Sequence, residues 1–67
     1  MIIFGERLRE QRAELRLTQK DVARELNISV TCYAGYEQGY REPDFTTLIK
    51  ICRYFSVSAD YLLGIDK

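Results

Sequence analysis

The side chains suited to chemistry in this chain are hydrogen-bonding groups rather than catalytic ones. The 67 residues contain no histidine, no serine-centred nucleophile elbow and no glycine-rich phosphate loop. Acidic residues are scattered at the spacing of a solvated helix surface. These features argue against an enzyme. The remaining groups are hydroxyls, amides and guanidiniums between residues 18 and 41, which are the groups that proteins use to contact nucleic acid.

Metal and cofactor binding are also disfavoured. Cys32 and Cys52 are far apart in the chain and form no CxxC pattern. A structural zinc site requires about four ligands. We therefore predict two buried free thiols, no metal ion and no cofactor.

The candidate contact residues share one side of a helix predicted for residues 30–38. With about 100° of rotation per residue, this outer side carries Val30, Thr31, Ala34, Gly35 and Gln38. We expect Cys32, Tyr33 and Tyr36 on the opposite side to face the core. The Thr31 hydroxyl and the Gln38 amide are the only strongly polar groups of the outer side. The methyl groups of Val30 and Thr31 suit contact with thymine methyl groups.

Capping residues and apolar periodicity predict five short helices that position these groups. The first is expected from about Ile3 to Leu15. The later helices are predicted to begin at the caps Thr18, Ser29, Asp44 and Ser58, with Asp21 completing a capping box at Thr18. Asn27, Gly39 and Gly64 are expected to end three of them. The predicted core comprises Phe4, Leu8, Leu15, Val22, Ala23, Leu26, Tyr33, Tyr36, Phe45, Leu48, Ile51, Cys52, Phe55, Tyr61, Leu62 and Leu63.

Length and composition indicate one compact all-α domain that covers residues 1–67. The chain is 46% hydrophobic and 30% charged, as expected for a soluble globular protein. No apolar run approaches the roughly 20 residues that cross a bilayer. The amino-terminal segment does not have the pattern of a signal peptide, so we predict a cytoplasmic location without a membrane partner.

The second and third predicted helices are separated by about three residues, the spacing of a helix-turn-helix. In such a motif the second helix enters the major groove of DNA, while the first lies across the backbone. Spacing alone does not distinguish this motif from a structural bundle.

Short motifs in a fixed order make the distinction. They are Leu17-Thr18-Gln19, Val22-Ala23, Ile28-Ser29, Tyr36-Glu37 with Gly39, Arg41 with Pro43, and Ser58-Ala59-Asp60-Tyr61-Leu62-Leu63. In this order the chain resembles the Cro and phage-repressor family, also called Xre-type, over nearly its whole length. The resemblance implies a five-helix, lambda-repressor-like fold and a transcriptional regulator, most often a repressor. It also implies dimers on two-fold symmetric operators with half-sites about one helical turn apart.

The resemblance further assigns roles to individual residues. Arg12 and Glu37 match a pair that forms an internal salt bridge, so we interpret both as structural. Gln19 matches a residue that hydrogen-bonds a DNA phosphate. The wider set of expected phosphate contacts is Gln19, Lys20, Ser29, Gln38, Tyr40 and Arg41. The expected base contacts are Val30, Thr31, Ala34 and Gly35.

The outer side of the third helix departs from the family pattern, which often places Gln, Arg, Ser or Asn at the positions of Val30, Thr31 and Gly35. Two interpretations remain open. Small side chains could let the helix sit deep in the groove and contact thymine methyl groups. Alternatively the base-reading surface has weakened, and phosphate contacts and DNA shape supply the specificity.

Partners follow from these assignments. We predict double-stranded DNA and a second copy of the chain, with Tyr54, Tyr61, Leu62 and Ile65 as possible dimer contacts or, alternatively, as packing within one molecule. No small-molecule ligand is implied. The ten basic and ten acidic residues give zero net charge, which together with the apolar outer side favours a rival: a protein-interaction module or antitoxin-type component with weak or no DNA binding.

Overall fold

Five α-helices make up the regular structure of residues 1–66, the part of the chain that the computed structural model describes. They are α1 (Ile2–Glu14), α2 (Gln19–Leu26), α3 (Val30–Gln38), α4 (Phe45–Phe55) and α5 (Ala59–Leu63), and these residues contain no β-strand. The predicted all-α fold is confirmed. None of these helices has the length and apolar character needed to traverse a bilayer.

The starts of α2, α3, α4 and α5 are set by side-chain caps. Thr18 forms the predicted capping box: its hydroxyl accepts from the Asp21 N–H at 3.0 Å, and its own N–H donates to the Asp21 carboxylate at 2.9 Å. Ser29, Asp44 and Ser58 cap the next three helices through their side-chain oxygens. The four predicted caps are confirmed.

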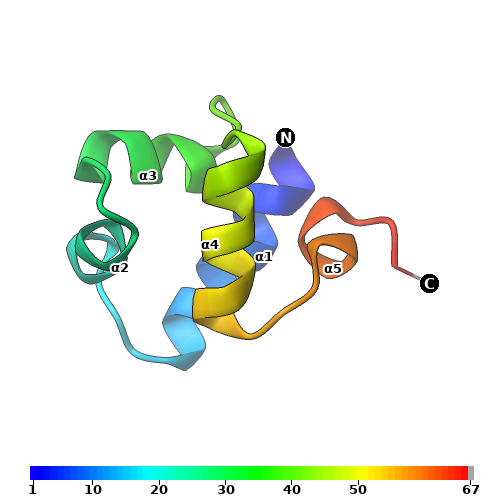
Figure 1. Cartoon of the computed structure of the whole chain (residues 1–67), viewed down its shortest axis with the longest axis horizontal. Coiled ribbons are helices and arrows are strands. Elements are labelled where there is room, and N and C mark those ends of the chain that lie inside the picture. The colour runs from blue at the N-terminus through cyan, green and yellow to red at the C-terminus, as the bar shows by residue number, and fades with distance from the viewer. Residues whose placement is uncertain (67) are drawn as a thin grey trace.

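The core lies where α1 packs against α3 and α5 and where α2 packs against α3 (Figure 1). Its apolar members are Phe4, Leu8, Val22, Ala23, Leu26, Tyr33, Tyr36, Ile51, Phe55 and Leu62. In the view of Figure 1, α2 and α3 lie on one side of α4 and α5 lies on the other. The arrangement leaves one side of α3 without a covering helix.

Two predicted core residues are exposed, and both lie at helix ends. Leu15 is 52% exposed because it follows the last residue of α1, where the chain leaves the core to reach α2. Phe45 is 83% exposed because it is the first residue of α4 and no other element covers it. Cys32 and Cys52 are free thiols, as predicted, but both are half-buried rather than buried.

Helices α1 and α3 approach each other at Gly5. A Cβ atom added to Gly5 would lie 2.4 Å from the Glu37 carbonyl oxygen and 2.6 Å from that of Tyr36. Both neighbours are backbone atoms, which cannot rotate away as a side chain can. Glycine at this position is therefore what allows the two helices to pack at this distance.

Arg7 of α1 binds Tyr61 and Asp66 near the carboxyl-terminal end of the described residues. Its guanidinium donates to the Tyr61 carbonyl, forms an ion pair with Asp66 at 2.6 Å, and lies 4.6 Å from the centre of the Tyr61 ring. These contacts hold α5 and the segment after it against α1.

Candidate nucleic-acid interface

Helices α2 and α3 form a corner that is built by the chain between them. Asn27 adopts a left-handed conformation after α2, with φ of 59°. The Ile28 N–H donates to the Ala23 carbonyl at 3.0 Å, which closes the end of α2, and Ser29 then caps α3. Figure 1 shows α2 nearly end-on while α3 lies across the view, so the two helices point in different directions.

The two sides of α3 differ in burial as the helical wheel predicts. Tyr33 and Tyr36 are buried, and their rings make an edge-to-face contact with centroids 6.3 Å apart. On the outer side Val30 is 41% exposed, and Thr31 and Gln38 are also exposed. Ala34 is half-buried. The outer side is therefore accessible at its amino-terminal end and at Gln38.

Gly35 is an exception to the wheel. It was expected on the accessible side, but it is buried, because the side chain of Arg41 lies over it. The expectation that Gly35 is open to a ligand is wrong. The loop just after α3 folds back onto the helix, a contact that helical periodicity alone does not predict.

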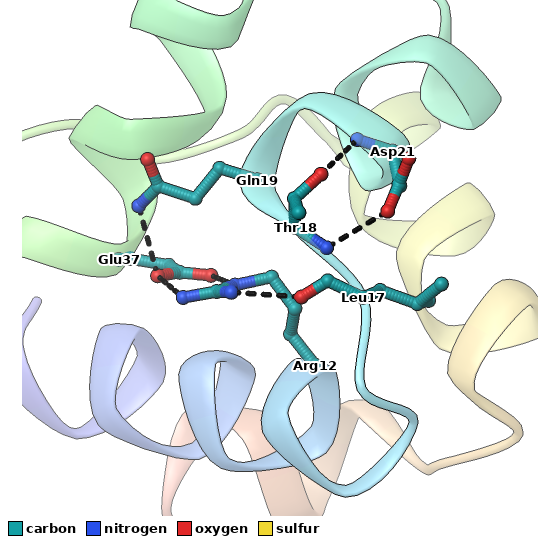
Figure 2. A network of polar contacts seen from close by, with 6 residues as sticks. All are labelled: Arg12, Leu17, Thr18, Gln19, Asp21 and Glu37. Atoms are coloured by element: carbon teal, nitrogen blue, oxygen red, sulfur yellow. Dashed lines mark hydrogen bonds and ion pairs between the residues drawn. The ribbon is translucent and has the colours of Figure 1, made fainter.

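A buried carboxylate connects the first three helices. Arg12 of α1 forms an ion pair with Glu37 of α3, with Arg12 Nε 2.6 Å from Glu37 Oε2 (Figure 2). A second bond joins Arg12 Nη2 to Glu37 Oε1 at 3.0 Å, and Arg12 Nη1 donates to the Leu17 carbonyl at 2.9 Å. Gln19 of α2 donates its amide to Glu37 Oε1 at 3.1 Å. The ion pair implied by the family resemblance is present, and it also holds the start of α2.

The charge of Glu37 is stabilised by these donors. Burial on its own raises the pKa of a carboxyl group, but the hydrogen bonds from Arg12 and Gln19 hold the pKa of Glu37 below its usual value. The Tyr33 hydroxyl is buried near this carboxylate, and burial raises its pKa. Glu37 is therefore ionised at neutral pH and has a structural role.

The bond to Glu37 changes the interpretation of Gln19. The resemblance implies that Gln19 contacts phosphate, whereas here its amide nitrogen is already a donor to Glu37. An amide NH₂ group carries two hydrogens. The second amide hydrogen of Gln19 has no acceptor within residues 1–66, and the side chain is oriented by the Glu37 carboxylate.

The other expected phosphate contacts lie at the ends of the two motif helices and are exposed. Lys20 is in the first turn of α2, Ser29 precedes α3, and Gln38, Tyr40 and Arg41 are at or beyond the carboxyl-terminal end of α3. The Ser29 oxygen accepts from the Cys32 N–H at 3.0 Å, which leaves its hydrogen free to be donated.

The expected dimer contacts divide into three groups. Leu62 is the residue of α5 that is completely buried in the core. The prediction that it contributes to a dimer contact is therefore wrong. Tyr54 and Tyr61 are half-buried, and Tyr61 lies under the Arg7 guanidinium. Ile65 is 66% exposed. Leu62 is buried where α5 packs against α1 and α4, and the local sequence does not specify this packing.

Two groups that help to position the helices of the site were not predicted from the sequence. Gly5, at the α1–α3 contact, carries a weak signal, because a glycine inside a helix costs about 1 kcal/mol relative to alanine and is retained for a reason. The Leu17 carbonyl, which accepts from Arg12, carries no signal in its residue type.

The capped corner of α2 and α3, with one side of α3 buried and the other accessible, defines a helix-turn-helix domain. The chain belongs to the helix-turn-helix family, which matches residues 8–62. The resemblance to the Cro and phage-repressor family is thus confirmed.

The named relatives are regulators of transcription. The chain is 46% identical over 64 residues to the HTH-type transcriptional regulator ImmR of Bacillus subtilis, a match that covers 96% of this chain and 50% of that protein. It is 41% identical over 59 residues to the cryptic phage CTXphi transcriptional repressor RstR of Vibrio cholerae, covering 88% of this chain and 53% of RstR. The HTH-type transcriptional activator BcrR of Enterococcus faecalis is 37% identical over 61 residues, which cover 91% of this chain and 30% of BcrR.

The chain therefore spans about half the length of the curated relatives ImmR and RstR. Transcriptional regulators of this family are a non-enzymatic class, in agreement with the prediction that the chain is not an enzyme.

Proposed function

We propose that this chain is a sequence-specific double-stranded DNA-binding transcriptional regulator, a repressor, that inserts α3 into the major groove. The observation that carries the proposal is the accessible outer side of α3, presented by a helix whose opposite side is buried in the core. We place the protein in the cytoplasm, where it would meet its operator. Its named relatives include both a repressor and an activator.

The base contacts that we propose on α3 are Val30 and Thr31, with Ala34 beside them. Val30 and Thr31 are in the first turn of α3, which is the part of a recognition helix that reaches base edges. The Thr31 hydroxyl can donate or accept, and both side chains present methyl groups to thymine. Specificity through DNA shape remains the alternative on this surface.

Phosphate binding is assigned to Gln19, Lys20, Ser29, Gln38 and Tyr40. The first N–H groups of α2 and α3 have no partners within their helices and favour an anion. Lys20 is the one cation of this group. We therefore expect a shallow dependence of DNA affinity on salt, since log K falls by about 0.9 for each phosphate neutralised.

The test of the proposed function is a selection of bound sites from random duplexes, followed by a salt titration on the enriched duplex. We expect an enriched sequence with two-fold symmetry and an affinity that falls as salt rises. Failure to enrich any sequence would reject sequence-specific DNA binding. The rival, a protein-interaction module, would then gain support from the accessible side of α3, which carries no charged side chain among Val30, Thr31, Ala34 and Gln38.

Replacing Thr31 with alanine should relax the preference at one base pair by about 1–3 kcal/mol, because the hydroxyl would no longer contact a base edge. Affinities for the enriched duplex and its single-base variants, measured by fluorescence anisotropy, provide the readout. Thr46→Ala is the matched control, since Thr46 is an exposed helical threonine on α4. Equal base preferences in the Thr31→Ala variant and the wild type would remove Thr31 from the interface.

We also propose that the chain binds its operator as a homodimer, with Ile65 and the half-buried Tyr54 and Tyr61 as candidate contacts. Ile65→Asp should shift the protein from dimer to monomer in analytical ultracentrifugation, because it places a charge in an apolar contact. Ile49→Asp, at another exposed isoleucine, is the control. A dimer of unchanged stability in Ile65→Asp would exclude this surface.

A further inference from the structure

The side chain of Arg41 lies in the space that a side chain at position 35 would occupy. The Arg41 N–H donates to the Gly35 carbonyl at 3.2 Å, which returns the loop to α3. A Cβ atom added to Gly35 would lie 2.5 Å from Arg41 Cδ, 2.8 Å from Cγ and 3.1 Å from Cβ. The aliphatic part of the Arg41 side chain (its stem, Cβ to Cδ) therefore occupies the space beside Gly35 that a larger residue would fill.

The order of these distances gives the course of the side chain. The separation from Gly35 shortens from Cβ to Cγ to Cδ, so the stem approaches the helix as it extends. The guanidinium is bonded to Cδ, so it begins next to the stem atom that lies nearest to Gly35. From this course we infer that Arg41 can bring a cation to the side of α3 where Gly35 has no side chain.

No other charge is available on the accessible side of α3. Glu37 is the one charged residue within Val30–Gln38, and it is buried in its bond to Arg12. Arg41 is exposed and forms no ion pair within residues 1–66.

The carboxylates nearest to Arg41 in the chain have other partners. Glu42 lies 3.6 Å from the amino-terminal ammonium, and Asp44 accepts from the Thr47 N–H at 2.8 Å. Within residues 1–66 the Arg41 guanidinium therefore has no carboxylate partner.

We propose that Arg41 is a specificity-determining residue that hydrogen-bonds guanine in the major groove. Gly35 is the positioning residue, because the absence of a side chain there lets Arg41 pack against α3. This inference rests on the proposed function and reassigns Arg41 from the phosphate contact that the family resemblance implies. A guanidinium presents a planar fork of donors that matches the O6 and N7 acceptors of guanine. Val30, Thr31 and Ala34 offer no such fork, so Arg41 supplies the guanine contact that α3 lacks.

The experiment compares four variants with the wild type, on the duplex that the wild-type chain enriches from a random pool and on duplexes with each G·C pair replaced. Arg41→Ala should lose the preference at one G·C pair by about 5- to 150-fold. Arg41→Lys should weaken the same preference less than Arg41→Ala does and should keep the salt dependence, because a lysine retains the charge without the planar fork. Gly35→Ala should also reduce this preference, since the added methyl displaces the stem. Arg53→Ala, an exposed arginine of α4, is the control for loss of charge and should leave the preference unchanged.

A thermal melt separates displacement of Arg41 from loss of the fold. Gly35→Ala should melt at or above the temperature of the wild type, because alanine favours the helix and the side chain that it meets is flexible. Loss of the G·C preference in this stable variant is the expected signature of a positioning residue.

Two outcomes overturn the proposal in different ways. If Arg41→Ala weakens binding to every duplex by the same factor, Arg41 is a phosphate contact, and the proposed function stands without this inference. If the wild-type chain enriches no duplex, the proposed function fails and the inference fails with it. An unchanged G·C preference in Gly35→Ala would show that Gly35 does not position Arg41.

Discussion

Replacing Glu37 with alanine is expected to lower the free energy of unfolding by about 3–5 kcal/mol, because the change leaves a partly buried guanidinium without its partner. The Glu37 side chain is 3% exposed and that of Arg12 is 19% exposed, so water replaces the lost bonds poorly. The substitution also removes the acceptor that holds Gln19 of α2. A domain of this size has little stability in reserve.

Urea denaturation followed by circular dichroism measures this effect, with Glu25→Ala as the control at an exposed acidic residue of α2. The pH dependence provides a second measurement. Because the pKa of folded Glu37 is lowered, its contribution is present above the ordinary glutamate pKa and is lost as the pH falls through the folded value. Glu37→Ala should therefore lose less stability than the wild type on acidification. A change in stability no larger than that of Glu25→Ala would contradict the role given to this carboxylate.

Replacing Gly5 with alanine should destabilise the domain by about 1–3 kcal/mol or more, the usual effect of forcing extra atoms into a packed contact. The added methyl would meet the backbone carbonyls of Tyr36 and Glu37 at 2.6 and 2.4 Å, so α1 and α3 would have to separate. The sign is opposite to that of helix propensity, which favours alanine over glycine by about 1 kcal/mol. Separation of α1 from α3 would also lengthen the Arg12–Glu37 bonds.

The thermal midpoint reports this loss, with about 4–8 °C expected for each kcal/mol in a domain of this size. Gly35→Ala is the matched control, because the same substitution in α3 meets side-chain atoms of Arg41, of which Cγ and Cδ can rotate away, and no backbone carbonyl is among the three nearest atoms. If Gly5→Ala melts as high as the wild type, the two helices can move apart without loss, and the close contact is not required.

The helix boundaries could be predicted because their causes are local. A cap such as Thr18 or Ser29 bonds to an N–H three residues away, so the sequence contains both partners within one turn. Leu15 and Phe45 could not be predicted in the same way. Periodicity shows the direction of a side chain from its helix, but not whether another element covers that direction at the end of the helix.

The candidate site was predictable to the extent that it depends on α3 alone. The accessible Val30 and Thr31 and the buried Tyr33 follow from the wheel. The contacts that determine Gly35 and Gln19 come from outside their own helices: Arg41 lies in the loop just after α3, and Glu37 lies in another helix. No local pattern encodes such contacts, and the family resemblance supplied only the Arg12–Glu37 pair.

The buried carboxylate of Glu37 also bears on how this domain can change over evolution. Glu37 joins α1, α2 and α3 from the inner side of α3, whereas Val30 and Thr31 lie on the outer side and make none of these bonds. If Val30 and Thr31 contact bases as proposed, substitutions there would alter the choice of operator while the bonds of Glu37 are kept. The same fold could then be used by regulators that bind different promoters. Positions 30 and 31 would be the first to vary in a design that aims at a new operator.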